Sequence, residues 1–161
     1  MSALQRALPD DILLEHACRG LLVYGSNPIV EAAAELGELH AARFAARRPH
    51  GIEAHRLRLA RRVDVLVAAI APVPNVDARL HPESVGAIVD RFASLCAIAF
   101  RAPRARVTSA EIDDARAQLG GVRADYVELI DQVSAGTCCL PNTHLPRDTY
   151  SGLRLMMRRH R

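Results

Sequence analysis

The chain contains no lysine and no tryptophan, and only 4% of its residues are aromatic although 50% are hydrophobic. A core with so few rings must be filled by Ala, Leu, Val and Ile, a composition that favours closely packed helices over a sheet sandwich. All 21 basic residues are arginine. This bias reads more naturally as the mark of a GC-rich genome than as a functional choice, and the sequence does not separate the two.

Long apolar runs and targeting signals are also missing. No segment reaches the roughly 18 apolar residues of a membrane helix, and the start of the chain carries Asp10 and Asp11 without the apolar core of a signal peptide. We therefore expect a cytoplasmic protein with no membrane partner. The net charge is only +3, and arginines are interleaved with 18 acidic residues, so we expect no nucleic-acid partner.

Motifs that identify catalysis or cofactor binding are absent as well. The chain has no phosphate loop, no Gly-x-Gly-x-x-Gly, no Gly-x-Ser-x-Gly, no His-Glu-x-x-His and no Cys-x-x-Cys. Its four cysteines lack metal-type spacing, and Cys18 and Cys96 lie in apolar patterns typical of a core. The sequence thus predicts no bound cofactor.

Hydrophobic periodicity predicts helices throughout the chain. Apolar residues recur at helical spacing in four long segments, 28–47, 52–70, 82–101 and 109–136, and in two short ones, 9–20 and 146–159. Gly120 and Gly121 predict a kink in the last long helix or its break into two. No alternation of period two persists, so no sheet is expected. We expect one domain, residues 1–161, that is all-α: an up-and-down bundle of four long helices with short helices at both ends.

The helix expected over 82–101 has two different sides, and Pro82 suits its first position. Its apolar side is formed by Val85, Ile88, Val89, Phe92, Cys96 and Ala99. Its polar side carries Glu83, Asp90 and Ser94. Small residues such as Gly86 lie between these polar residues and would let another helix approach. The polar side is therefore either a solvated face or a buried network with Arg91 or Arg62.

His40 lies within the apolar stripe of the 28–47 helix, where a buried imidazole needs a hydrogen-bond partner. Glu83 or Asp90 supplies that partner if the two helices are neighbours. A histidine oriented by a carboxylate is also the arrangement of a general acid or base near neutral pH. The candidate catalytic residues are therefore His40, Glu83, Asp90 and Arg91, with the arginine as a clamp for an anionic or carbonyl oxygen.

The candidates for substrate binding lie on the flanks of these stripes: Arg43, Arg62, Asp64 and Ser94. Arg43 lies beside the His40 stripe, where it extends over apolar surface or binds an anion. Arg62 and Asp64 lie on the two flanks of the 52–70 helix's apolar stripe.

A metal site is the alternative for a dense set of acidic and histidine residues: Glu31, Glu35, Glu38, His40, His50, Glu53 and His55. Metal-binding bundles use a Glu-x-x-His spacing that projects inward. Here Glu35 and Glu38 point away from the stripe that holds His40. The simpler interpretation is a charged outer face with no bound metal.

The order of these residues carries a family resemblance. A histidine on a long helix is followed by Arg-Arg-Val-Asp at 61–64, then by Glu-Ser-x-Gly-x-Ile-x-Asp-Arg from Glu83, with Ser94 three residues later. This order resembles the bacterial family called domain of unknown function 4254, over about residues 15–160. The resemblance implies a helical fold and points to His40, Asp64, Glu83, Asp90 and Arg91, but it implies no reaction. Departures at 41–43, at His81 and at 156–158 indicate a divergent member.

Three functional hypotheses remain. The first is a small cofactor-independent enzyme that acts on a small molecule by acid/base chemistry, as in a cyclase, isomerase or lyase step of specialised metabolism. The second is a non-catalytic helical interaction protein, in which the polar network is structural and the Met156–Met157 tail docks a partner. The third is a metal-dependent bundle enzyme. The enzyme hypotheses require a small-molecule partner, and a homodimer is left open.

Overall fold

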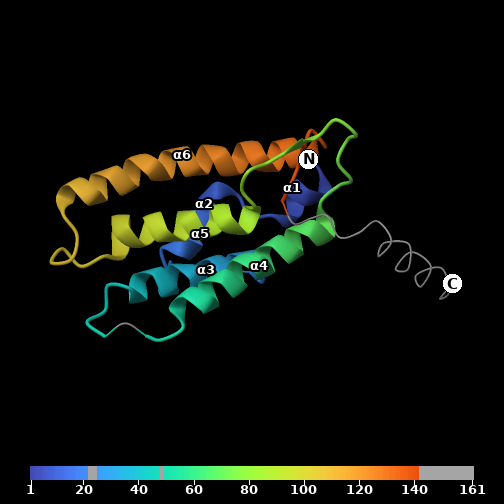
Figure 1. Cartoon of the computed structure of the whole chain (residues 1–161). Helices are drawn as coiled ribbons and strands as arrows, with labels where there is room; N and C mark the ends of the chain where they lie inside the picture. The colour runs from blue at the N-terminus through green and yellow to red at the C-terminus, as the bar shows by residue number, and fades with distance from the viewer. Residues whose placement is uncertain (22–24, 48, 142–161) are drawn as a thin grey trace.

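The computed structural model of the chain describes residues 1–21, 25–47 and 49–141 (Figure 1). In chain order its elements are α1 (Ala3–Ala7), α2 (Asp11–Cys18), α3 (Pro28–Ala42), α4 (Ile52–Ile70), β1 (Arg79–Leu80), α5 (Val85–Cys96), the π-helical turn η1 (Ala97–Arg101), α6 (Ser109–Ser134) and β2 (Cys138–Cys139). The all-α prediction is confirmed. The helix expected over 146–159, with its Met156–Met157 tail, lies outside the described residues.

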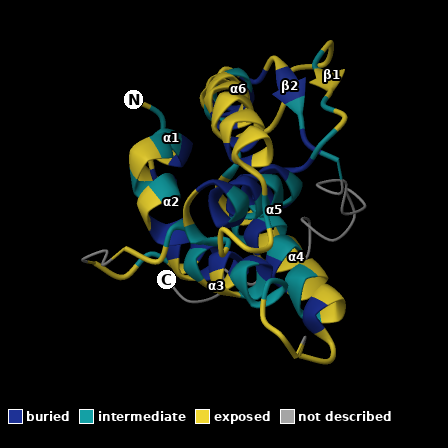
Figure 2. Cartoon of the chain, turned by 90° about the vertical axis from the view of Figure 1, so that its left-hand side faces the viewer, coloured by how far each residue is buried: buried dark blue, intermediate teal, exposed yellow. Residues whose placement is uncertain are grey.

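Helix α5 is the centre of the bundle. It packs against α2, α3, α4 and α6, and Figure 1 shows α6 along one side of it and α3 and α4 along the other. Figure 2 shows buried residues gathered where the helices face one another. The apolar side predicted for the 82–101 helix, which α5 and η1 form together, is confirmed, because each of its members is at most 5% exposed: Val85, Ile88, Val89, Phe92, Cys96 and Ala99.

The start of α5 differs from the prediction, because the helix begins at Val85 rather than at Pro82. The Ser84 hydroxyl accepts a hydrogen bond from the Ala87 N–H at 3.1 Å and so caps the helix. A second cap comes from α4, where Asp64 Oδ1 accepts from the Gly86 N–H at 2.7 Å. Two side chains thus satisfy N–H groups of the first turn, which makes Ser84 the last residue before the helix.

Other helix boundaries also differ. A short helix, α1, precedes the predicted one, and α3 ends at Ala42 rather than near residue 47. The helix expected to run to Arg101 changes to a π-helical turn after Cys96. Helix α6 continues through Gly120 and Gly121, so the break into two helices does not occur. Neither glycine is at a close contact that would require the absence of a side chain.

Two short strands correct the expectation that there is no sheet. Strand β1 pairs with β2 in parallel, with Arg79 opposite Cys138 and Leu80 opposite Cys139. The pairing holds the connection between α4 and α5 beside the end of α6, with the His81 N–H bonded to the Cys139 carbonyl at 2.9 Å. Strands of two residues are too short to show a period of two in the sequence.

No helix in the described ranges combines the length and the apolar character needed to cross a membrane.

Candidate active site

His40 lies near the end of α3 on the face that packs into the bundle. Asn27 caps this helix and Pro28 occupies its first position. The periodicity that buries Ile29, Ala33 and Leu36 also buries His40, which is 3% exposed. Its Nε2 lies 2.9 Å from Asp90 Oδ1 on α5. The predicted pairing of a buried histidine with a carboxylate is therefore confirmed, and the carboxylate is Asp90.

The other nitrogen of His40 identifies the tautomer. Arg43 Nη1 lies 3.2 Å from His40 Nδ1. A guanidinium group has only donors, so Nδ1 must accept this bond. The imidazole proton is then on Nε2 and is donated to Asp90. The carboxylate thus fixes both the orientation of the ring and the position of its proton.

Two residues near the start of α4, Glu53 and Arg56, close this pair into a ring. Arg43 Nη2 donates to Glu53 Oε1 at 2.5 Å, and Arg56 Nη1 donates to Glu53 Oε2 at 2.7 Å. Arg56 Nε lies 3.1 Å from Asp90 Oδ2, although its N–H makes no aligned hydrogen bond. We call these residues the His40 ring: His40, Arg43, Glu53, Arg56 and Asp90. It joins α3, α4 and α5 through their polar side chains.

The arginines of this ring correct the prediction, which placed Arg91 or Arg62 in the network. Arg43 holds the pKa of Glu53 below its usual value through their hydrogen bond. The carboxylate therefore stays charged and keeps Arg43 at the ring. Arg43 was expected to extend over apolar surface or to bind an anion, and in the described structure its head group joins His40 to Glu53.

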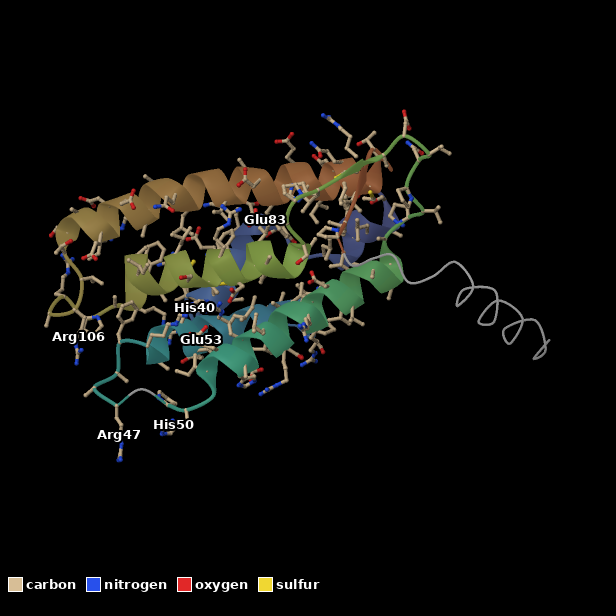
Figure 3. The ribbon with its side chains drawn as sticks, in the orientation of Figure 1. His40, Arg47, His50, Glu53, Glu83 and Arg106 are labelled. Carbon is tan, nitrogen blue, oxygen red and sulfur yellow. The ribbon has the colours of Figure 1, made fainter. Side chains whose placement is uncertain are left out.

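Glu83 and Arg91 form a separate cluster on the opposite side of α5. Arg91 Nη2 lies 2.8 Å from Glu83 Oε2 and 3.3 Å from Asp125 Oδ2 on α6. Figure 3 shows Glu83 on the α6 side of α5, away from His40 and Glu53. The side chains of Glu83 and Arg91 are each 40% exposed, which makes this a screened surface pair. The structure thus does not bring the four predicted catalytic residues together.

Asp64 and Arg62 also lie away from His40. Asp64 caps α5, as described above, and burial raises its pKa against the opposing effect of its bonds from Gly86 and Ser84. Arg62 is exposed on α4, and no acceptor in the described part of the chain is paired with it. Neither residue shares a cavity with His40.

A cleft of about 510 Å³ lies between the end of α3, the α5–η1 junction, the loop 102–108 and the start of α6. Three predicted residues line it together: His40, Arg43 and Ser94. Its apolar wall includes Leu95 and Ile98, and Arg106, Glu111 and Asp114 contribute charge. The volume lies within the usual range for small-molecule sites. Asp90 and Arg91 do not line this cleft, and Glu83 lines a different one beside β1.

The residues considered for a metal site are dispersed among separate ion pairs. Glu35 pairs with His55 at 2.8 Å, and Glu38 pairs with Arg101 at 2.8 Å. Within residues 1–21, 25–47 and 49–141, no three His, Cys, Asp or Glu side chains are grouped as metal ligands. These pairs agree with the charged outer face that the sequence predicts for this region.

The buried cysteines are poor candidates for a nucleophile. Cys18 and Cys96 are both in the core, as predicted. The hydrogen bond that the Cys18 thiol makes to Cys96 stabilises its protonated form, and this bond and burial raise the pKa of Cys18 well above its usual value. The reactive form of cysteine is the thiolate, which this environment disfavours.

Two groups of site residues were not predicted in their observed roles. Glu53 was considered only for a metal site and Arg56 was not singled out, although their i, i+3 spacing places them on one side of a helix start. Arg106 and Glu111 carry no such signal, because they belong to a loop and a helix far from His40 in the chain. Only the packing of α6 against η1 places them at the cleft.

Comparison of the chain with models of protein families, with curated proteins and with solved structures finds no match in any of the three.

Proposed function

We propose that the protein is a small cofactor-independent enzyme that acts on a small molecule, with His40 as its general acid and base. The observation that carries the proposal is a buried histidine at a cleft, with Nε2 held by Asp90. Because Arg43 lines the cleft and Asp90 does not, the nitrogen on the cleft side is Nδ1. Asp90 thus acts as a positioning residue behind the ring.

This geometry suits reactions that remove a proton and return it. Nδ1 takes a proton from the substrate, and the imidazolium that forms is stabilised by the Asp90 carboxylate. The proton is then given to another atom of the substrate or to a leaving group, which restores neutral His40. Isomerisation, cyclisation and elimination all follow this course. Ser94 can hydrogen-bond the substrate, and Leu95 and Ile98 provide apolar contact.

Deuterium exchange tests this proposal without a known product. Small carboxylates, phosphorylated compounds and uncharged carbonyl compounds are incubated in D₂O with the protein, and deuterium incorporation is followed by mass spectrometry. We expect His40→Gln to lower the exchange rate at least about 100-fold, the usual contribution of a general base. The Gln amide nitrogen can occupy the position of Nε2 and keep the bond to Asp90, so the fold is preserved.

The matched control is His55→Gln, which changes a histidine paired with Glu35 outside the cleft. It should leave the exchange rate unchanged. Exchange that continues at the wild-type rate in His40→Gln contradicts the proposal.

A non-catalytic interaction protein is the second candidate, and two observations favour it. Both nitrogens of His40 are occupied within the ring, as expected for a purely structural network. The connection from α4 to α5 also exposes Val73, Val76 and Leu80, which a partner could cover. In this case no compound exchanges in the wild type, and His40→Ala, which removes the bond to Asp90, lowers the free energy of unfolding.

We also propose that the chain is a divergent member of the domain of unknown function 4254 family and that the protein is located in the cytoplasm. The residues quoted for the resemblance support the first of these. A structure of a family member with a His–Asp pair on the equivalents of α3 and α5 tests it.

A further inference from the structure

We propose that the substrate is an organic anion whose carboxylate or phosphate binds Arg106 and Arg43 at the mouth of the cleft. We also propose that this anion draws Arg43 away from His40 and so uncovers the base. The inference rests on the proposed use of the cleft as the substrate site. It assigns a ligand class to that site and a second role to Arg43.

The charged side chains that line the cleft differ in their hydrogen-bond partners. Glu111 accepts from the Thr108 N–H at 2.7 Å and from its hydroxyl at 2.8 Å, and these bonds lower its pKa. Asp114 accepts from Gln118 at 2.7 Å. Arg106, in contrast, is exposed and is paired with no acceptor among the described residues. Because their donors are neutral, Glu111 and Asp114 keep their negative charges. Arg106 is the cation at the cleft that no described carboxylate neutralises.

Further exposed basic side chains lie around the mouth of the cleft. Figure 3 shows Arg47, His50 and Arg106 at the same end of the molecule, on the two loops that follow α3 and η1. Arg47 and His50 are exposed, and neither has a partner within the described ranges. The unpaired arginines of this group, Arg47 and Arg106, raise the local concentration of anions beside the cleft. A soluble anion would thus be guided to the cleft that His40 lines.

A hydrogen bond from Arg43 covers His40 Nδ1, the atom that the proposed function assigns as the base. Arg43 reaches His40 Nδ1 at 3.2 Å, and its side chain, which is 30% exposed, lines the cleft. A guanidinium group binds a carboxylate or phosphate more strongly than a neutral imidazole. An anion in the cleft therefore competes for Nη1, while Nη2 stays on Glu53. When Nη1 moves, Nδ1 regains a free lone pair beside the bound substrate.

Calorimetry with inorganic phosphate and with succinate tests the inference on the full chain at low salt. We expect both anions to bind the wild type, and Arg106→Gln to weaken binding about tenfold, as for the loss of a charged hydrogen bond. The matched control is Arg62→Gln, because Arg62 is also exposed and lies outside the cleft. It should change the affinity less than about twofold, within the effect of one remote surface charge.

Three outcomes overturn the inference. They are no binding of either anion, equal weakening by the two variants, and Arg106-dependent sedimentation with anionic vesicles, which would assign the site to a lipid headgroup. The inference and the proposed function fail separately. If anions bind in an Arg106-dependent way but no His40-dependent exchange occurs, the anion site stands and the proposed enzyme function fails. If uncharged compounds exchange and Arg106→Gln leaves that exchange intact, the enzyme function stands and the anion site fails.

Discussion

Two carboxylates beside α5 have opposite electrostatic environments. Asp90 meets the Nε2–H of His40 and the Arg56 guanidinium, 2.9 and 3.1 Å away. The donors to Asp64 within the described part of the chain are both neutral, the Gly86 N–H and the Ser84 hydroxyl. With no cation to offset desolvation, burial raises the pKa of Asp64. One carboxylate is therefore suited to stabilise an imidazolium, and the other is a helix cap that is costly to ionise.

The raised pKa of Asp64 predicts a pH-dependent effect of Asp64→Asn. Between the ordinary pKa of 3.8 and the raised folded value, the folded state binds more protons than the unfolded state. Wild-type stability therefore falls as pH rises through this window. Asparagine still accepts from Gly86 but never ionises. The melting temperature of the variant, relative to wild type, should rise from about pH 3 to about pH 7.

Thermal unfolding at several pH values, monitored by circular dichroism, measures this difference. Asp77→Asn is the control, because Asp77 is exposed and has no partner among the described residues. A difference between Asp64→Asn and wild type that stays constant or shrinks over this range would show that desolvation does not dominate at Asp64.

At the residue scale, periodicity was enough to predict a buried His40 with a carboxylate partner on the next long helix. It could not choose between Glu83 and Asp90. That choice depends on the rotation of α5 about its axis, which places Asp90 toward α3 and α4 and Glu83 toward α6. The contact of Arg43 with Glu53 depends on the path of the loop after α3, which hydrophobic periodicity does not predict.

At the scale of elements, the crossing of α4 and α5 depends on one glycine. A Cβ at Gly86 would lie 2.0 Å from the Ala60 carbonyl oxygen of α4 and 2.8 Å from Asp64 Oδ1. The first of these contacts is with backbone, which cannot move without separating the helices. The position of Asp90, one turn further along α5, is fixed by the same crossing.

Substitution of this glycine therefore predicts a large loss of stability. Gly86→Ala should lower the free energy of unfolding by at least about 2 kcal/mol, as for overpacking of a closed contact. The matched control is Gly120→Ala in α6, where an added Cβ meets nothing within 4 Å. That change should raise stability by about 0.5–1 kcal/mol through helix propensity. Urea unfolding measures both, and equal effects of the two variants would contradict the close crossing.

The existence and type of the long helices followed from apolar spacing, whereas their ends did not. Pro82 fits a first helical position by its chemistry, but the caps from Ser84 and Asp64 place the start at Val85. The Asp64 cap is a tertiary contact between α4 and α5, which a local pattern does not contain. The β1–β2 pairing is also a contact that a local pattern does not contain, because β1 precedes α5 in the chain and β2 follows α6.

At the scale of the whole molecule, the cleft is a product of assembly. The ends of α3 and η1 and the start of α6 meet at one end of the bundle (Figure 1). His40 and Ser94 could be proposed for a site from their helices alone. Arg106 could not, because a loop residue has no periodicity that predicts its neighbours. The charge of the cleft, and hence its ligand class, therefore became visible only in three dimensions.

In the proposed enzyme Asp90 holds the proton of His40 on Nε2, and an anion in the cleft uncovers Nδ1. Long-range ¹H–¹⁵N spectra of ¹⁵N-histidine-labelled protein test both statements at about pH 8, above the ordinary titration range of histidine, with His40→Gln to assign the signals. We predict the Nε2–H tautomer for His40, with an Nδ1 resonance that shifts as inorganic phosphate is added. A proton on Nδ1, or an Nδ1 resonance that stays fixed throughout the titration, would contradict the account.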